Sequence, residues 1–323
     1  MRQVRYYEHG GPEVLRVEEA DVPRPGPGEA LIRTEAIGAN FIDTKFRRGD
    51  ENLPFQRPLP AGLTGDVVGV VEAVGDGVAA DLVGSRVASL ADPAFAEYVT
   101  VDAAWLVPVP DGVDLGMASM LSMGAPVALG ALRVGRLAPG ETVLVHAAAG
   151  GIGHQAVQLA KLLGAGTVIA TASSAAKLDF AKEHGADVGI DYTAPDWPDQ
   201  VRAAAPDGVH VLLDSVGGTT MVRGLDLLAP LGTTVLYGMA GGDSRDLPAT
   251  SLYALRSITG FSIMGWRQAR PEQARQDMAD IAEHAAEGRL RTAVHATFSL
   301  DEVAKAHQVL DDRAQLGRLL VVP

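Results

Sequence analysis

The 323-residue sequence contains no cysteine, and this absence excludes several kinds of chemistry at once. Without a thiol the chain forms no disulfide and carries no thiolate nucleophile. Cysteine-ligated zinc and iron–sulfur clusters are excluded for the same reason. The eight histidines show neither HExxH nor HxH spacing, so we expect no metal centre. The GxSxG motif of serine hydrolases is also absent.

The chain lacks long apolar runs and an excess of positive charge as well. No apolar stretch is long enough to span a bilayer, and neither a charged leader nor a lipidation motif is visible, so we expect a cytoplasmic protein. The formal net charge is -13, whereas a nucleic acid or an anionic membrane requires clustered lysine and arginine. We therefore predict neither a nucleic-acid partner nor a membrane partner. The composition, 47% hydrophobic and 21% charged, is that of a globular protein, and the length suggests about two domains.

One segment, VLVHAAAGGIGHQAVQLAK (143–161), combines a short apolar strand, a glycine turn and the start of a helix. Val143 to Val145 fit a buried parallel strand, and the glycines that follow let the backbone turn sharply and approach a ligand. Gly151, Gly153 and Ala156 match the GxGxxA pattern of a dinucleotide-binding turn. The free amides and the positive dipole end of the following helix would face the same turn, which suits a phosphate. The predicted pyrophosphate contacts are Gly150, Gly151, Ile152 and Gly153.

Apolar runs and helical patterns alternate after this turn. The further strands are expected at Val168–Ala172, Val188–Ile190, Val209–Leu213, Thr233–Tyr237 and Ile258–Ile263. With the strand before the glycine turn they make six. This alternation predicts an α/β fold with a doubly wound Rossmann domain and a six-stranded parallel sheet.

The residues about twenty positions after the glycines indicate whether the cofactor is NAD(H) or NADP(H). NAD-binding sheets of this type place an aspartate or glutamate there, on the ribose hydroxyl. This chain has Ala172, Ser173 and Ser174 instead, so two hydroxyls and Lys177 are available for a 2′-phosphate. A lysine at a helix start opposes the helix dipole unless an anion is near. We therefore predict NADP(H); the structural alternative is that one serine merely caps the helix expected at Ala175–His184.

Residues before about Gly116 follow a different pattern, with short alternating strands broken by turn clusters such as PRPGPGE. This predicts a β-rich domain with one helix at Phe41–Arg48. A helical passage from Asp114 to Leu137, interrupted at Gly124–Pro126, joins the two parts. The strands are expected at Leu15–Val17, Ala30–Ala36, Val67–Val74, Arg86–Leu90 and Tyr98–Leu106. The tail is expected to form a helix at Pro271–Glu287, a strand at Thr292–Phe298, a helix at Asp301–Leu310 and a strand at Arg318–Val322.

Five longer stretches carry more specific information than the glycines alone. They are GANFIDTKFRRG (38–49), VVGVVEAVGDGV (67–78), LRVGRLAPGETVLVHAAAGGIG (132–153), DSVGG (214–218) and LGRLLVVP (316–323). Together they resemble the medium-chain dehydrogenase/reductase superfamily, in particular its zinc-free quinone oxidoreductase, or zeta-crystallin-like, branch. The resemblance runs nearly end to end. It implies a GroES-like β-barrel domain at residues 1–118 and 264–323, and a Rossmann domain at residues 119–263.

The same resemblance implies the chemistry and the residues of the site. Zinc-dependent members place a cysteine where Asn40 stands and a His-Glu pair where Gly65 and Asp66 stand, so it implies reduction of quinones or α,β-unsaturated carbonyls by NADPH without zinc. Asn40 and Lys45 are the implied catalytic residues, because the charge that develops on the carbonyl oxygen needs hydrogen-bond donors. A water is the alternative to Lys45 as the final proton donor. The implied cofactor contacts are Asp43, Gly150, Gly151, Ile152, Gly153, Ser173, Ser174, Lys177, Tyr192, Ser215, Gly238, Met239, Ala240, Gly241 and Arg313.

Several alternatives remain open at this point. Arg313 is equally compatible with a solvated surface position, and Tyr192 with a local cap of the preceding strand. Many quinone reductases of this branch have tyrosines where Lys45 and Asp50-Glu51 stand, so the charged run RRGDEN (47–52) indicates either a polar acceptor or an exposed loop without contacts. A ketoreductase or a secondary-metabolite tailoring reductase on the same scaffold is the alternative reaction. A non-catalytic NADPH-binding sensor or structural protein is the alternative from another class.

The last expected strand of the Rossmann sheet has a consequence for assembly. Ile258–Ile263 would form an exposed apolar edge in a lone subunit. Pairing with a second copy of the chain removes such an edge. We therefore expect a homodimer through this edge strand, with a small-molecule quinone or enone as substrate.

Overall fold

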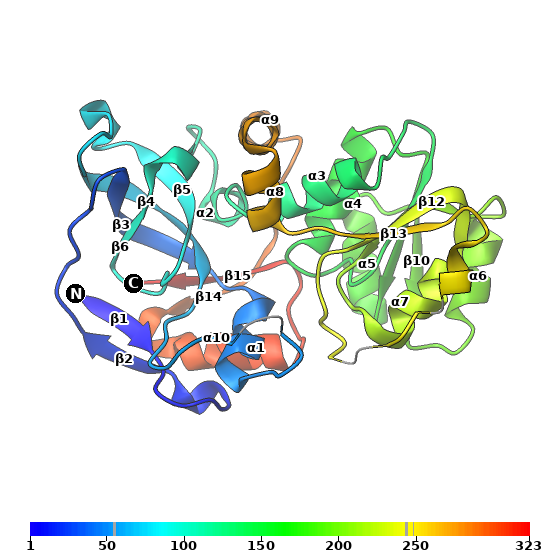
Figure 1. Ribbon diagram of the computed structural model, residues 1–323, viewed down its shortest axis with the longest axis horizontal. Helices are drawn as coiled ribbons and strands as arrows, with labels where there is room; N and C mark the ends of the chain where they lie inside the picture. Colours follow the sequence, from blue (N-terminus) through cyan, green and yellow to red (C-terminus); the bar gives the residue numbers. More distant parts are fainter. Residues whose placement is uncertain (54–55, 243–244, 248) are drawn as a thin grey trace. The chain divides into compact units, whose positions relative to one another are not determined.

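The computed structural model describes residues 1–53, 56–242, 245–247 and 249–323 (Figure 1). The chain forms two compact units: unit 1 is Met1–Gly124 with Met278–Pro323, and unit 2 is Ala125–Asp277. In Figure 1 the blue and red ends of the chain belong to unit 1 and most of the green and yellow middle belongs to unit 2. Asp277 accepts a hydrogen bond from Trp266 Nε1 (3.0 Å) and pairs with Arg133 (2.8 Å), which ties the segment before residue 278 to unit 2.

Unit 1 is built on a mainly antiparallel sheet whose described strands run in the order β14-β15-β3-β4-β5-β7, with β6 paired to β3. Its strands are β3 (Glu29–Gly38), β4 (Gly65–Val74), β5 (Arg86–Ala91), β6 (Tyr98–Asp102), β7 (Val107–Pro108), β14 (Val294–Ser299) and β15 (Arg318–Val322). A separate hairpin pairs β1 (Arg2–Arg5) with β2 (Arg16–Glu19). Ile32, Val67 and Val71 belong to one hydrophobic core that Leu319 and Val321 of β15 also enter.

The helices of unit 1 flank this sheet. They are α1 (Phe41–Arg48), α2 (Leu115–Ala118) and α10 (Val303–Asp311), while α9 (Pro271–Ala286) begins in unit 2 and ends in unit 1. The sequence predicted the bounds of α1 correctly. Gly49 explains where it ends, because this residue is left-handed (φ +67°) and its amide bonds back to the carbonyls of Lys45 and Phe46. Short 3-10 turns lie at Pro12–Val14, Ala80–Leu82, Ala103–Trp105 and Leu300–Glu302.

Unit 2 contains the predicted doubly wound sheet. All of its described strand pairs are parallel, and the order is β10-β9-β8-β11-β12-β13. The strands are β8 (Thr142–Val145), β9 (Thr167–Ala172), β10 (Val188–Asp191), β11 (Val209–Asp214), β12 (Leu228–Leu236) and β13 (Ser257–Gly260). The helices are α3 (Gly124–Val134), α4 (Gly153–Leu162), α5 (Ala175–Glu183), α6 (Trp197–Ala204), α7 (Gly218–Leu225) and α8 (Ile263–Ala269). The strand order reverses between β8 and β11, which defines the switch point where ligands of such sheets bind.

Three sequence expectations were wrong in detail. Ile263 does not extend the last strand but opens α8, because Ser262 Oγ accepts a hydrogen bond from the Gly265 amide (3.4 Å) and caps a helix. Gly124–Pro126 does not interrupt a helix but starts α3, since proline is tolerated in a first turn where its missing amide would have no partner. The strand β1 was missed because its RQVR sequence is mostly charged or polar.

Within the described residues, none of the helices combines the length and the apolar character that a bilayer crossing requires.

Candidate functional site

The glycine turn lies at the carboxyl end of β8, next to the switch point of the sheet. Gly153 opens α4, and a Cβ on it would lie 2.3 Å from the carbonyl oxygen of Ala147 and 2.8 Å from Cα of Ala148, so only glycine fits. Ala147 itself is left-handed (φ 51°), which makes the turn sharp. The strand, turn and helix follow one another as the pattern predicted, with Gly151 and Ile152 at the N-terminus of α4, where a phosphate would meet free amides.

Two further turns meet at the same edge of the sheet. Ser215 follows β11, and its carbonyl accepts a hydrogen bond from the Ala240 amide (2.8 Å), while the Gly241 amide bonds to Val216 O (2.8 Å). A Cβ on Gly238 would lie 3.0 Å from Ser215 O, so this approach depends on glycine. The structure thus brings together the predicted contacts Ser215, Gly238, Met239, Ala240 and Gly241 at the carboxyl edge of the sheet that also holds the glycine turn.

Aspartate 214 fixes the first of these turns. Its Oδ1 accepts hydrogen bonds from the amides of Val216 (2.6 Å) and Gly217 (2.9 Å). Tyr237 follows β12, and burial of its phenol raises the pKa of that group despite a hydrogen bond with Ser215. The phenol therefore stays protonated and can keep its contact with Ser215.

The predicted 2′-phosphate contacts lie at the start of α5. Lys177 Nζ donates a hydrogen bond to Ser173 Oγ (3.2 Å), and Ser174 Oγ accepts one from the Lys177 amide (3.4 Å) and caps the helix. Ser174 therefore caps the helix, as the structural alternative expected of one serine, whereas Ser173 stays a predicted phosphate contact. Asp191 pairs in register with Ala172, but its carboxylate bonds to the amide and the hydroxyl of Thr193 (2.8 and 2.7 Å).

The remaining predicted contacts divide between the two units. The Tyr192 ring contacts the His146 ring edge-on, with the centroids 6.3 Å apart, and its amide bonds to Ala172 O (3.1 Å) in unit 2. Arg313 lies in unit 1 at the end of α10, where its guanidinium stacks over the Phe41 ring at 5.9 Å from the centroid. The surface alternative for Arg313 thus matches its exposure, although its guanidinium is held by an aromatic face.

The short helix α1 carries the three predicted site residues of unit 1. Asn40 precedes the helix and does not cap it with its side chain. Asp43 is buried, and its carboxylate accepts hydrogen bonds from the amide (2.7 Å) and the hydroxyl (3.0 and 2.9 Å) of Thr64. Burial raises the pKa of Asp43 to about 7, although the bonds from Thr64 oppose this shift. Asp43 therefore fastens α1 to the segment that enters β4.

Lys45 on the same helix forms a sheltered ion pair. Its Nζ lies 2.6 Å from Asp50 Oδ2, and the two side chains are 7% and 19% exposed. The hydrogen bond from Lys45, aided by the Asn52 amide, holds the pKa of Asp50 at about 2. Arg47 is fully buried and pairs with Asp311 (2.5 Å). The alternative that the charged run is an exposed loop without contacts is therefore wrong.

A buried polar cluster joins Asn40 to Asp66, a position already compared with the zinc ligands, and to three residues that the sequence analysis did not single out. Arg318 on β15 donates to Asn40 Oδ1 (2.8 Å) and pairs with Asp66 (2.6 Å), while Asn40 Nδ2 donates to Asp66 (3.2 Å). Ser122 Oγ donates to the second oxygen of Asp66 (2.7 Å), and Ser119 accepts from Arg318 Nε (3.2 Å). We call these five residues the Arg318 cluster. The one signal in the sequence for Arg318 was an arginine at the start of the otherwise apolar final strand RLLVV.

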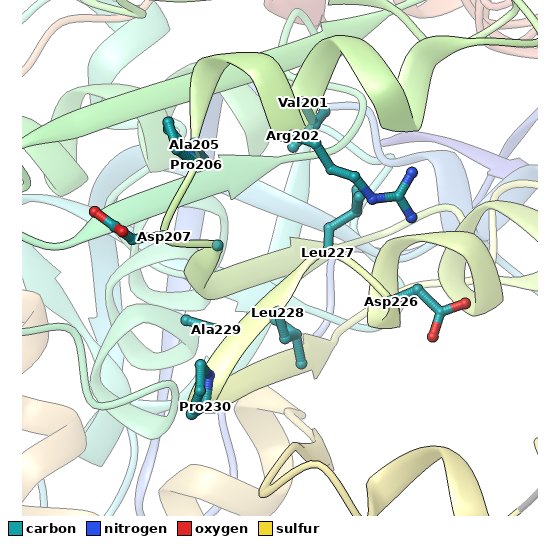
Figure 2. Close-up of a pocket in the computed structure, with 11 residues that line it drawn as sticks. Val201, Arg202, Ala205, Pro206, Asp207, Asp226, Leu227, Leu228, Ala229 and Pro230 are labelled. Carbon is teal, nitrogen blue, oxygen red and sulfur yellow. The ribbon is translucent and has the colours of Figure 1, made fainter.

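A surface depression of unit 2 lies away from these residues (Figure 2). Figure 2 shows that its lining comes from the end of α6, from the loop before β11 and from the start of β12, with Arg202, Asp207 and Asp226 among the labelled side chains. It therefore lies at the amino ends of the strands, opposite the edge that holds the glycine turn. None of the predicted site residues lines it.

The part of the chain that the structure describes contains no group of three or more histidine, aspartate or glutamate side chains placed to hold a metal ion.

Comparison with protein families finds two matching models. Residues 26–111 match the GroES-like domain of alcohol dehydrogenases, and residues 151–283 match the zinc-binding dehydrogenase family. These descriptions agree with a GroES-like domain in unit 1 and a Rossmann domain in unit 2.

Comparison with individual proteins gives matches over nearly the whole chain. The sequence is 36% identical over 334 residues to a quinone oxidoreductase of Pseudomonas aeruginosa, covering 100% of this chain and 99% of that protein. It is 34% identical over 333 residues to a 2-haloacrylate reductase of Burkholderia, covering 98% and 97%. Among solved structures, mycobacterial Rv1454c in complex with NADPH superposes with a TM-score of 0.93 at 36% identity, covering all of both chains.

Proposed function

Because the chain belongs to the medium-chain dehydrogenase/reductase superfamily, in its quinone oxidoreductase or zeta-crystallin-like branch, we propose that it reduces quinones or α,β-unsaturated carbonyls with NADPH and without zinc. The observation that carries this proposal is the pairing of Lys177 with Ser173 beside the glycine turn, where an NAD-binding sheet would have a carboxylate. The NADPH in the mycobacterial relative and the reductase names of the bacterial relatives support the same function.

The residues of unit 2 fit the cofactor by their chemistry. The amides at the N-terminus of α4 suit the pyrophosphate, and the close approach that Gly153 permits requires a residue without a side chain. Ser173 and Lys177 suit the 2′-phosphate, since an ammonium and a hydroxyl bind a dianion well. Ser215 and the Gly238–Gly241 loop border the same edge and would enclose the rest of the cofactor. When bound, NADPH supplies a hydride from its nicotinamide ring.

The residues of α1 would serve the acceptor. Reduction of a conjugated carbonyl places negative charge on the carbonyl oxygen, and this charge needs donors that are already in position. The Lys45 ammonium has three protons, of which the bond to Asp50 uses one. Asp50, with its lowered pKa, stays ionised beside the Lys45 ammonium. Lys45 can therefore donate to the oxygen, and it or a water would give the final proton to carbon.

The Lys45–Asp50 pair also favours one kind of acceptor. Removing the remaining water from this partly buried ion pair costs free energy. A polar ligand can replace that water with hydrogen bonds, whereas a purely apolar ligand cannot. We therefore place small, polar conjugated carbonyl compounds ahead of extended apolar quinones. The Burkholderia relative, a 2-haloacrylate reductase, is named for a small conjugated substrate of this kind.

The edge strand β13 supports a proposal about assembly. It pairs with β12 on one side and forms the end of the described sheet on the other, with residues that are only partly buried. An unpaired edge of this kind is commonly covered by a second copy of the chain. We propose a homodimer through β13, and light scattering at micromolar concentration would measure it; a monomer would contradict this proposal.

The reaction is tested with purified protein, NADPH carrying deuterium at C4, and a panel of enones, haloacrylates, ketones and quinones. NADPH oxidation is followed by its absorbance, and the position of the deuterium in the product is determined by NMR. We expect deuterium on the carbon β to the carbonyl of an enone, and no loss of rate after dialysis against a chelator. Lys45→Met should lower the rate, whereas Lys305→Met, an exposed lysine on α10, should not.

Two results would contradict the proposal. No oxidation of NADPH with any acceptor would favour a non-catalytic binding protein. Deuterium on the carbonyl carbon of a ketone, with no turnover of enones, would favour the ketoreductase alternative.

A further inference from the structure

The guanidinium of Arg318 is fully hydrogen-bonded within unit 1. Its side chain is 4% exposed and that of Asp66 is fully buried. Each of the five guanidinium protons has an acceptor: Ser119 Oγ for Nε, Ala39 O and Asn40 Oδ1 for Nη1, and Asp66 Oδ2 and Ser119 O for Nη2. The backbone makes room for this group at Gly38, where a Cβ would lie 1.7 Å from Arg318 Nη2.

The Arg318 cluster also decides how the amide of Asn40 points. An arginine only donates hydrogen bonds and an ionised carboxylate only accepts them. The Asn40 oxygen must therefore face Arg318 and its nitrogen must face Asp66, because a flipped amide would lose both bonds. One N–H of Asn40 remains beyond the bond to Asp66. Because the two hydrogen bonds fix the plane of the amide, this second N–H of Asn40 points in one fixed direction.

Zinc does not fit at this place. The zinc-dependent members of the family have their ligands where Asn40, Gly65 and Asp66 stand. Both oxygens of Asp66 are engaged by Arg318, Asn40 and Ser122, and a positive charge already lies 2.6 Å away. A side chain at position 65 would also collide, since a Cβ there lies 2.8 Å from Ile37 Cγ2 and 3.1 Å from Ala94 Cβ. The residues present suit a guanidinium instead.

Burial of an ion pair is weak evidence for a contribution to stability. Removing two charges from water costs about as much as their attraction returns, and apolar replacements of such pairs are often neutral or stabilising. Orientation is a different matter, because a planar guanidinium with five directed donors fixes the groups around it more narrowly than a lysine does. The geometry therefore favours positioning of Asn40 over stabilisation.

We propose that Arg318 is a positioning residue, a fixed internal cation that occupies the place of a metal and orients the carboxamide of Asn40 for the reaction. The part about the reaction rests on the proposed function, whereas the part about orientation does not. The two parts therefore call for separate measurements.

The orientation is measured by NMR, and the sequence makes this measurement simple. Asn40 and Asn52 are the two asparagines of the chain, so selective 15N-asparagine labelling gives two pairs of side-chain amide signals. Asn52 is exposed and serves as the internal reference. We expect one pair that exchanges slowly with solvent, from Asn40. Arg318→Lys keeps the positive charge but loses the planar set of five N–H donors. The side-chain amide signals of Asn40 should therefore change their chemical shifts and exchange with solvent at least about tenfold faster.

The reaction is measured with the same variants. A misplacement of about 1 Å costs roughly 100-fold in rate, so we expect kcat of Arg318→Lys to fall by about 10- to 100-fold and the deuterium isotope effect on hydride transfer to rise. In an Asn40→Ala background, Arg318→Lys should cost almost nothing further, because it acts through Asn40. Arg86→Lys, the same change at the Glu35 ion pair of unit 1, is the matched control and should leave kcat and both amide signals unchanged.

The outcomes separate the two parts. If the wild-type protein oxidises no NADPH with any acceptor, the proposed function fails and the amide signals alone decide the orientation. The positioning proposal is overturned if the Asn40 amide signals are unchanged in Arg318→Lys. It is also overturned if Arg318→Lys lowers kcat by the same factor in the wild-type and in the Asn40→Ala background. Should Arg318→Lys fold poorly, the neutral pair Asp66→Leu with Arg318→Met replaces it, since it adds no asparagine, and the expectations for the signals and the rate are the same.

Discussion

The two units hold their polar site residues in opposite ways. In unit 2 the groups proposed for the cofactor are backbone amides of short turns and a partly exposed pair, Ser173 and Lys177, four residues apart on one helix start. In unit 1 the polar groups are buried and joined over long stretches of chain, since Arg318 and Asn40 are 278 residues apart. In unit 2 the proposed ligand contacts are therefore groups of local turns, whereas in unit 1 Asn40 belongs to a buried hydrogen-bond network of residues far apart in sequence.

The consequence of a substitution should therefore differ between the two units. An exposed lysine interacts through solvent and contributes little to the fold, so changing it alters ligand affinity and leaves stability nearly constant. A buried charge that loses its partner is destabilising, so changing it alters stability, pH dependence and geometry together. Substitutions in unit 2 should accordingly change ligand affinity, and substitutions in unit 1 should change stability. Four experiments test this contrast.

The largest effect is expected for Arg318→Met alone. This change leaves the fully buried Asp66 carboxylate without its guanidinium partner and with only Asn40 and Ser122 as donors, which should lower the free energy of unfolding by about 3 to 5 kcal/mol. Adding Asp66→Asn removes the uncompensated charge and should restore most of this loss. Urea unfolding followed by circular dichroism measures both variants. Equal stability of the single and the double variant would show that the charge of Asp66 does not matter for folding.

The next effect is a pH dependence that belongs to unit 1. Burial raises the pKa of Asp43 from 3.8 to about 7, so the folded state favours the protonated acid. Its contribution to stability is complete below the unfolded pKa and is lost as the pH rises through about 7. Between pH 5 and pH 8 this amounts to about 3 kcal/mol.

Asp43→Asn should remove this dependence, because an amide accepts from the Thr64 amide and donates to its hydroxyl at any pH. Urea unfolding at pH 5 and pH 8 gives the difference for each protein, and Asp81→Asn, at an exposed aspartate of the same unit, is the control. The prediction is wrong if Asp43→Asn loses as much stability as the wild type between the two pH values.

The same contrast explains what could be predicted from the sequence. The glycine turn, the alternation of strands and helices in unit 2 and the serines in place of a carboxylate are local patterns, because each is contained in a short stretch of sequence. The Arg318 cluster could not be derived in this way. Its members lie on β15, before α1, on β4 and near α2, and only the folded sheet brings β15 beside β3. The ion pair of Lys45 with Asp50 is local, but its burial depends on the surrounding unit.

A smaller effect, on affinity alone, is expected in unit 2 for Lys177→Ala. Loss of one charged hydrogen-bond donor to a 2′-phosphate should raise the KM for NADPH by about 10- to 100-fold, while the KM for NADH stays constant. Steady-state kinetics with both cofactors measures this, and Lys182→Ala in the last turn of the same helix is the control. An equal rise for NADPH and NADH would place Lys177 elsewhere on the cofactor.

The smallest effects separate the adjacent serines of unit 2. Ser174 caps α5, so Ser174→Ala should lower the free energy of unfolding by about 1 kcal/mol. Ser173 is exposed and bonds to the Lys177 ammonium, so Ser173→Ala should leave stability unchanged and weaken NADPH binding about 3- to 10-fold. Urea unfolding and fluorescence titration with NADPH are measured on both variants, with NADH as the reference ligand. If the two variants exchange these phenotypes, Ser173 rather than Ser174 supports the helix, and the phosphate would bind on the other side of its first turn.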